Sequence, residues 1–111
     1  MIELLRYKNR DGTVPFADWL GSLRDKVAQA RIRVRLRQLE AGNLGDNKPV
    51  GDGVLELRIH VGAGYRVYGA RHGQSIVLLL CGGDKSSQPT DIRRAKEFWK
   101  EWKQRDRKSV V

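Results

Sequence analysis

Hydrophobic and polar residues alternate along residues 54–61 in a pattern that predicts a half-buried β-strand. One face of this strand carries Leu55, Leu57, Ile59 and Val61, and the other carries Glu56, Arg58 and His60. A glycine-rich turn precedes a second predicted strand at residues 65–70, and a third follows at residues 76–81. Because the third strand is apolar on both faces, we expect it to be covered on both sides at the centre of an antiparallel meander.

The N-terminal half predicts one strand followed by two helices. Residues 2–7 are short and apolar and run into a turn-forming cluster of Asn, Asp and Gly. Thr13 and Pro15 suit a helix start, and apolar residues then recur at helical spacing, with a break near residues 21–22. Residues 23–40 have the composition of a helix, although residues 31–37 alternate with period two, which alone favours a strand. We interpret their arginines as a solvated helix face.

The remaining segments predict a loop and a final helix. Residues 43–53 hold three glycines, two asparagines and a proline, so we expect a loop there. From residue 89 to about residue 107, one apolar stripe at helical spacing includes Trp99 and Trp102, which we interpret as core residues. The order β-α-α-β-β-β-α predicts an α+β fold, in which an antiparallel sheet of about four strands packs against helices. At this length, residues 1–111 are expected to form a single domain.

The net charge of the chain limits the classes of molecule that it is expected to bind. The chain holds 22 Lys and Arg against 13 Asp and Glu, so its formal net charge is 22 − 13 = +9 and its pI is about 10.2. Such an excess favours a polyanion, such as an RNA phosphate backbone, an anionic membrane or an acidic protein. Charge alone does not choose among these partners.

The sequence also indicates a reducing environment. Its single cysteine, Cys81, ends an apolar run, and we interpret it as a small core residue rather than as a catalytic thiol. The N-terminus lacks the long uncharged core of a signal peptide, and no segment approaches the length of a membrane span. We therefore expect a cytoplasmic protein without a membrane partner. No spacing of His, Cys, Asp or Glu indicates a metal site.

Cations from separate segments form the candidate site. Arg58 and His60 share one face of their strand, Arg66 lies on the next strand, and Lys85 follows the third. A meander can bring these positions together, and several cations on one patch are costly unless they meet an anion. We therefore expect a phosphate-binding surface. The alternative is that Glu56 and other acids pair with the arginines as ordinary surface ion pairs.

The same residues carry a resemblance to a known family. The runs Leu-Glu-Leu-Arg-Ile-His at residues 55–60, Gly-Tyr-Arg-Val-Tyr at residues 64–68 and Leu-Leu-Cys-Gly-Gly-Asp-Lys-Ser at residues 79–86 resemble the RelE/ParE toxin superfamily. More narrowly, they are similar to its HigB-like branch, often labelled phage-derived or addiction-module killer proteins. The resemblance covers nearly the whole chain and implies a RelE-like fold.

The resemblance implies a toxin that cleaves mRNA on the translating ribosome and is held inactive by a cognate antitoxin. In this branch the antitoxin is a helix-turn-helix protein, and operator DNA is bound only through the joint complex. The family's basic active-site positions fall on Arg58, Arg66 and Lys85. Two other functions remain open: a ParE-like inhibitor of gyrase, which shares the fold, and a non-catalytic basic RNA-binding module, which belongs to a different functional class.

The implied reaction needs no metal and no other cofactor, because the 2′-hydroxyl of the RNA attacks the neighbouring phosphorus. Arginine suits the stabilisation of phosphate charge but is a poor base, so His60 or Lys85 is the better proton carrier. His60 is added from strand alternation, not from the family. The remaining candidate RNA contacts are Tyr65, Tyr68, Arg71 and Ser86. Residues 86–89 also lack the aromatic that many relatives use to stack on a base.

Overall fold

The computed structural model describes the backbone of residues 1–110 and the side chains of residues 1–105. It is a mixed α+β structure with one five-stranded sheet and three helices. In chain order the elements are β1 (Glu3–Arg6), α1 (Pro15–Ser22), α2 (Lys26–Glu40), β2 (Asn47–Gly51), β3 (Val54–Ile59), β4 (Tyr65–His72), β5 (Ile76–Gly83), the short 3₁₀ helix η1 (Lys85–Ser87) and α3 (Gln88–Val110).

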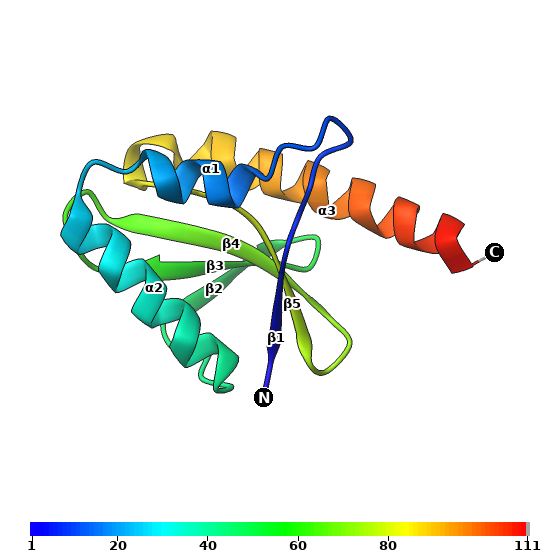
Figure 1. The fold of residues 1–111 in the computed structure, drawn as a ribbon, viewed down its shortest axis with the longest axis horizontal. Coiled ribbons are helices and arrows are strands. Elements are labelled where there is room, and N and C mark those ends of the chain that lie inside the picture. The colour runs from blue at the N-terminus through cyan, green and yellow to red at the C-terminus, as the bar shows by residue number, and fades with distance from the viewer. Residues whose placement is uncertain (111) are drawn as a thin grey trace.

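The sheet forms the middle of three layers, with α1 and α2 on one face and α3 on the other (Figure 1). Phe16 and Leu36 from the two shorter helices are buried against Leu57 and Val67 of the sheet. On the opposite face, apolar side chains of α3 are buried against β4 and β5, with Trp99 only 7% exposed. The prediction that the tryptophan stripe covers the sheet is therefore confirmed.

Strand order is β1-β5-β4-β3-β2. The predicted antiparallel meander of β3, β4 and β5 is confirmed, and β5 is buried along most of its length. The sheet as a whole is not antiparallel, because β1 pairs with β5 in parallel. This pairing joins the two halves of the chain, and no local pattern in residues 2–7 encodes it.

The predicted loop at residues 43–53 is wrong in part, since Asn47–Gly51 forms β2 and pairs antiparallel with β3. A tight turn makes this hairpin possible, with Gly51, Asp52 and Gly53 all at positive φ. Pro49 argues against a strand by sequence, but β2 is the edge of the sheet, where the missing N–H of a proline is tolerated.

The arginine-rich stretch is helical, as predicted, because Ile32, Leu36 and Leu39 recur on the buried face of α2. Asp25 caps this helix by accepting a hydrogen bond of 3.0 Å from the backbone N–H of Ala28. Arg35 departs from the predicted solvated face: it is buried and donates hydrogen bonds to the carbonyls of Leu44 and Asp46. It thereby fixes the segment that leads into β2.

Within residues 1–110, none of the helices combines the length and apolar character of a membrane-spanning segment.

Candidate functional site

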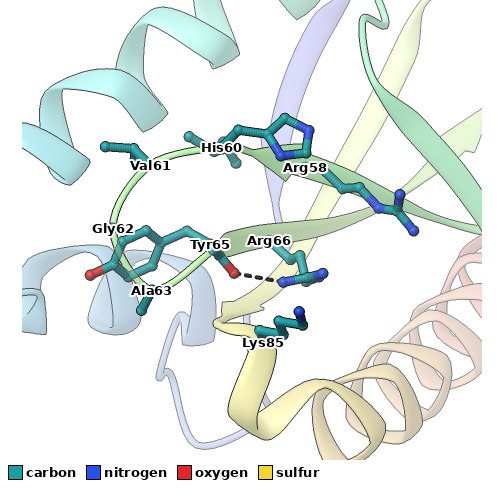
Figure 2. Close-up of a pocket in the computed structure, with 10 residues that line it drawn as sticks. Arg58, His60, Val61, Gly62, Ala63, Tyr65, Arg66 and Lys85 are labelled. Atoms are coloured by element: carbon teal, nitrogen blue, oxygen red, sulfur yellow. Dashed lines mark hydrogen bonds between the residues drawn. The ribbon is translucent and has the colours of Figure 1, made fainter.

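The four predicted catalytic residues, Arg58, His60, Arg66 and Lys85, line one cavity of about 460 Å³. The cavity lies where the turn between β3 and β4 approaches the start of η1 (Figure 2). Figure 2 shows Arg66 and Lys85 pointing toward each other, with Arg58 on the neighbouring strand β3 and His60 directly after the end of that strand. Residues 61–64 of the turn complete the wall.

Sheet register explains why the cations converge. Arg58 and Arg66 are directly opposed on β3 and β4, and Arg66 is in turn opposed to Gly83 at the end of β5. Lys85 follows two residues later, so the chain returns it to the same end of the sheet. Like charges directly opposed on neighbouring strands repel each other, so this arrangement needs an anion nearby.

A buried carboxylate, Glu56, supplies part of that negative charge. Its side chain is 0% exposed, and its Oε1 accepts a 3.1 Å hydrogen bond from Arg58 Nε and lies 3.8 Å from Arg66 Nε. Its Oε2 accepts hydrogen bonds from the Tyr68 hydroxyl at 3.1 Å and from Gln88 Nε2 at 2.7 Å. One carboxylate thus connects β3 and β4, which carry the two arginines, to the start of α3, which directly follows the short helix that carries Lys85.

Burial alone would raise the pKa of Glu56, but hydrogen bonds from Gln88, Arg58 and Tyr68, together with the charge of Arg66, outweigh it and hold the pKa below its ordinary value. Glu56 is therefore an anion at neutral pH. Strand alternation predicted it on the polar face of β3. Because α3 covers part of that face, a charged residue there is buried and needs partners.

Tyr68 was predicted to contact RNA, and the structure contradicts this prediction. Its side chain is 0% exposed, packs in the core beneath α3 and donates to Glu56. Burial and the neighbouring carboxylate of Glu56 raise the pKa of Tyr68. A buried phenol cannot stack on a nucleobase, so Tyr68 acts as a support for Glu56.

His60 is held at the rim of the cavity by an acid from a distant segment. Its Nε2 contacts Oδ2 of Asp46, which directly precedes β2, and Arg58 donates its backbone N–H to the carbonyl of Asp46 at 3.1 Å. The hydrogen bond with His60 lowers the pKa of Asp46. No sequence pattern predicted this pair, because Asp46 lies in the segment interpreted as a loop.

Lys85 is the first residue of η1, which Asp84 caps through a hydrogen bond of 2.8 Å from the Ser86 backbone N–H. Its side chain is exposed, and among the described residues it forms no ion pair. Arg66 donates from Nη1 to the carbonyl of Gly64 at 2.7 Å, while its buried Nε has no hydrogen-bond partner in the described part of the chain. Both cations therefore retain capacity for an anionic ligand.

The other predicted RNA contacts fall in different places. Tyr65 lines the cavity, half-buried, with its ring centroid 6.3 Å from that of Trp19. Ser86 is exposed beside Lys85 but does not line the cavity, and its hydroxyl donates to Asp84. Arg71 lies five residues beyond Arg66 on β4, about 16 Å along the strand, so it belongs to the opposite end of the sheet.

Two further sequence interpretations concern residues outside the cavity. Cys81 is 1% exposed in the core, as predicted, and burial raises the pKa of its thiol to about 12. Among the side chains of residues 1–105, no group of three or more His, Cys, Asp or Glu converges in a way that could hold a metal ion.

Comparison with known proteins identifies the family of this chain. The family model described as phage-derived protein Gp49-like matches residues 18–100. The chain therefore belongs to this Gp49-like family, which is part of the RelE/HigB-like addiction-module killer superfamily. It is also 50% identical over 84 residues to a Haemophilus influenzae protein described as uncharacterized, with 76% of this chain and 85% of the relative covered. A toxin-antitoxin family implies an antitoxin as a protein partner.

Proposed function

We propose that this protein is the toxin of a type II toxin-antitoxin system and cleaves mRNA on the translating ribosome without a metal. A cognate helix-turn-helix antitoxin neutralises it, and the complex of the two binds operator DNA. The observation that carries the proposal is the cavity lined by Arg58, Arg66, Lys85 and His60. Family membership supports a toxin, and the cavity supplies a reason for RNA as its target.

The charge balance of the cavity favours a phosphate ligand over ordinary surface ion pairs. Arg58, Arg66 and Lys85 bring three positive charges to a lining that contains no carboxylate, because the nearby acids Glu56, Asp46 and Asp84 all lie outside it. Glu56 lies beneath the two arginines and leaves the exposed Lys85 free of an acid partner among the described residues. A phosphodiester in the cavity would satisfy the remaining positive charge.

The chemistry assigns a role to each side chain. The 2′-hydroxyl oxygen of the RNA attacks the adjacent phosphorus, the bond from phosphorus to the 5′-oxygen breaks, and a 2′,3′-cyclic phosphate and a 5′-hydroxyl result. With Nε2 engaged by Asp46, His60 presents Nδ1 to accept the 2′-hydroxyl proton, and Lys85 donates a proton to the departing 5′-oxygen. Arg66 and Arg58 stabilise the charge that develops on the phosphate oxygens.

The proposal is tested by induced expression of the wild type and of Lys85→Ala, with genome-wide mapping of RNA ends. We expect new ends inside coding regions for the wild type and a loss of cleavage of about 10²-fold or more for the variant. Lys100→Ala, an exposed lysine on α3, is the matched control and should cleave normally. Growth arrest with intact transcripts would contradict the proposal, and an accompanying DNA-damage response would indicate a gyrase inhibitor instead.

A second variant separates charge from proton transfer. Lys85→Arg keeps the positive charge but is a poor acid, so it should bind RNA like the wild type and cleave it slowly. Wild-type protein that has been stripped of metal with EDTA, and then freed of EDTA, should cleave mRNA on ribosomes as well as untreated protein does. If Lys85→Ala binds RNA weakly and the wild type shows no turnover, the protein is a non-catalytic RNA-binding module.

A further inference from the structure

A second groove, of about 330 Å³, lies between β1 and α2, away from the proposed catalytic cavity. Four leucines from β1, α1, α2 and β5 form its apolar part, namely Leu4, Leu20, Leu36 and Leu79. Its charged lining consists of Arg6, Arg33, Arg37 and Glu40. None of its lining residues belongs to the proposed catalytic cavity.

The groove adjoins an edge of the sheet with free backbone groups. β1 pairs only with β5, and the N–H groups of Glu3 and Tyr7 donate to the carbonyls of Ser75 and Leu79 on the β5 side, at 2.7 and 2.9 Å. Because backbone groups alternate in direction along a strand, those of Leu4 and Arg6 point away from the sheet. These two residues offer donors and acceptors to another strand.

The two edges of the sheet differ in how they resist such pairing. On the β2 edge, Pro49 lacks an N–H donor and the register with β3 shifts between Pro49 and Gly51. β1 contains neither a proline nor a register shift, although it is only four residues long. Just before β1, the Ile2 N–H donates to the carbonyl of Glu40 at 2.8 Å, and Figure 1 shows the N-terminus beside the C-terminal end of α2.

The three arginines of the groove have no acid partner among the described residues. Arg33 and Arg37 are one helical turn apart on α2, and Arg6 lies opposite them with its guanidinium 5.4 Å from the centre of the Phe16 ring. All three side chains are exposed. The groove therefore has a net positive charge of about two, because Glu40 offsets one of the three cations.

We propose that this groove binds an extended, acidic segment of another protein, which adds to the sheet as a strand beside β1. The backbone of the segment pairs with Leu4 and Arg6. On the side that faces α2, one apolar residue of the segment packs on the leucines, and acidic residues two positions away on either side meet the arginines. This inference does not depend on the proposed nuclease activity.

A protein segment fits the groove better than RNA does. Phosphates would satisfy the arginines, but they would leave the strand edge unpaired and the leucines without an apolar partner. A β-strand with alternating acidic and apolar residues satisfies all three features at once.

The test uses a synthetic seven-residue peptide with the order Thr-Glu-Thr-Leu-Thr-Glu-Thr, capped at both ends, and ¹⁵N-labelled full-length protein. Peptide at millimolar concentration should shift the NMR signals of residues 2–6 and 33–40, and it should slow hydrogen exchange at the Leu4 and Arg6 amides. A peptide with Lys in place of Glu should bind at least about ten-fold more weakly.

Variants of the protein complete the test. The exposed pair Arg33→Glu and Arg37→Glu should weaken binding by about ten-fold or more, whereas Arg31→Glu, on an exposed part of α2 that does not line the groove, should weaken it far less. Arg6→Pro should bind more weakly than Arg6→Ala, because only proline also removes the outward N–H.

Three outcomes would overturn the proposal. The peptide could shift only the signals of the catalytic cavity, which would indicate unspecific attraction to a cationic patch. It could bind without protecting the Leu4 and Arg6 amides, which would exclude strand addition. An RNA oligonucleotide could shift residues 33–40 while the peptide does not, which would assign the groove to nucleic acid. A Lys85→Ala protein that loses cleavage but still binds the peptide would separate this site from the proposed function.

Discussion

Replacement of Glu56 by glutamine should destabilise the fold strongly, although the two side chains have nearly the same shape. All hydrogen bonds that Glu56 makes are accepted from donors on Arg58, Tyr68 and Gln88. The glutamine amide has one acceptor oxygen and an NH₂ group, which would face donors. The substitution also removes the negative charge that compensates Arg58 and Arg66. Loss of one partner from a buried ion pair typically costs about 3–5 kcal/mol.

The lower part of that range applies here, because the Arg58 side chain is 32% exposed and can turn toward water when its partner is lost. The Arg66 side chain is only 13% exposed, so its charge stays largely buried and most of the cost comes from it. We expect a loss of about 3 kcal/mol in the free energy of unfolding, or a fall of about 15 °C in Tm for a domain of this size. Urea and thermal denaturation measure both quantities. Glu97→Gln, an exposed position on α3, is the matched control and should change stability by less than about 0.5 kcal/mol.

The pH dependence provides the refuting measurement. The pKa of Glu56 in the folded protein lies below its ordinary value of 4.5, which it regains on unfolding. Its stabilising contribution is therefore complete above pH 4.5 and is lost as the pH falls toward the lower pKa of the folded state. The stability difference between wild type and Glu56→Gln should shrink below pH 4.5. A difference that stays constant from neutral pH into acid would refute the view that Glu56 acts as a buried anion.

Two further predictions concern the packing around the sheet. A Cβ at Gly82 would lie 2.2 Å from a ring carbon of Trp19, so Gly82→Ala should lower the free energy of unfolding by about 2 kcal/mol or more. Gly21→Ala, in α1, meets nothing within 4 Å and should raise the free energy of unfolding by about 0.5–1 kcal/mol. Urea denaturation measures both changes, and equal effects of the two substitutions would contradict the packing at Gly82. Because burial raises the pKa of the Cys81 thiol to about 12, a disulfide reagent at pH 8 should label it only at the rate of unfolding, and rapid labelling of the native protein would contradict its burial.

The spacing of apolar residues within one segment was enough to predict most of the helices and strands. Apolar alternation identified β3 and β4, and helical spacing identified α2 despite the period-two arginines. The strand β2 was missed, because Pro49 and its neighbouring glycines are typical of loops, and only the position at a sheet edge makes a strand acceptable there. The parallel pairing of β1 with β5 joins residues more than seventy positions apart, which no local signal encodes.

In the candidate site, too, the sequence predicted the residues along each strand but not the contacts made by a distant helix. Arg58, Arg66 and Lys85 were proposed together from the motif and from strand order, and they do line one cavity. Alternation also placed Glu56 and Tyr68 on the same face, but it treated that face as exposed. The contribution of α3 was missing from that reasoning: once the helix covers the face, Tyr68 becomes a core residue and Glu56 becomes the shared partner of the arginines.

The link from Glu56 to Gln88 has a consequence for the nascent chain. Arg58, Arg66 and Lys85 are translated before Gln88, yet the carboxylate that holds the two arginines also receives a hydrogen bond from that residue at the start of α3. A polypeptide whose C-terminal helix has not left its own ribosome lacks this last contact. The hydrogen-bond network of Glu56 behind the two arginines is therefore complete only once the start of α3 has left the ribosome, after all three cations have been synthesised.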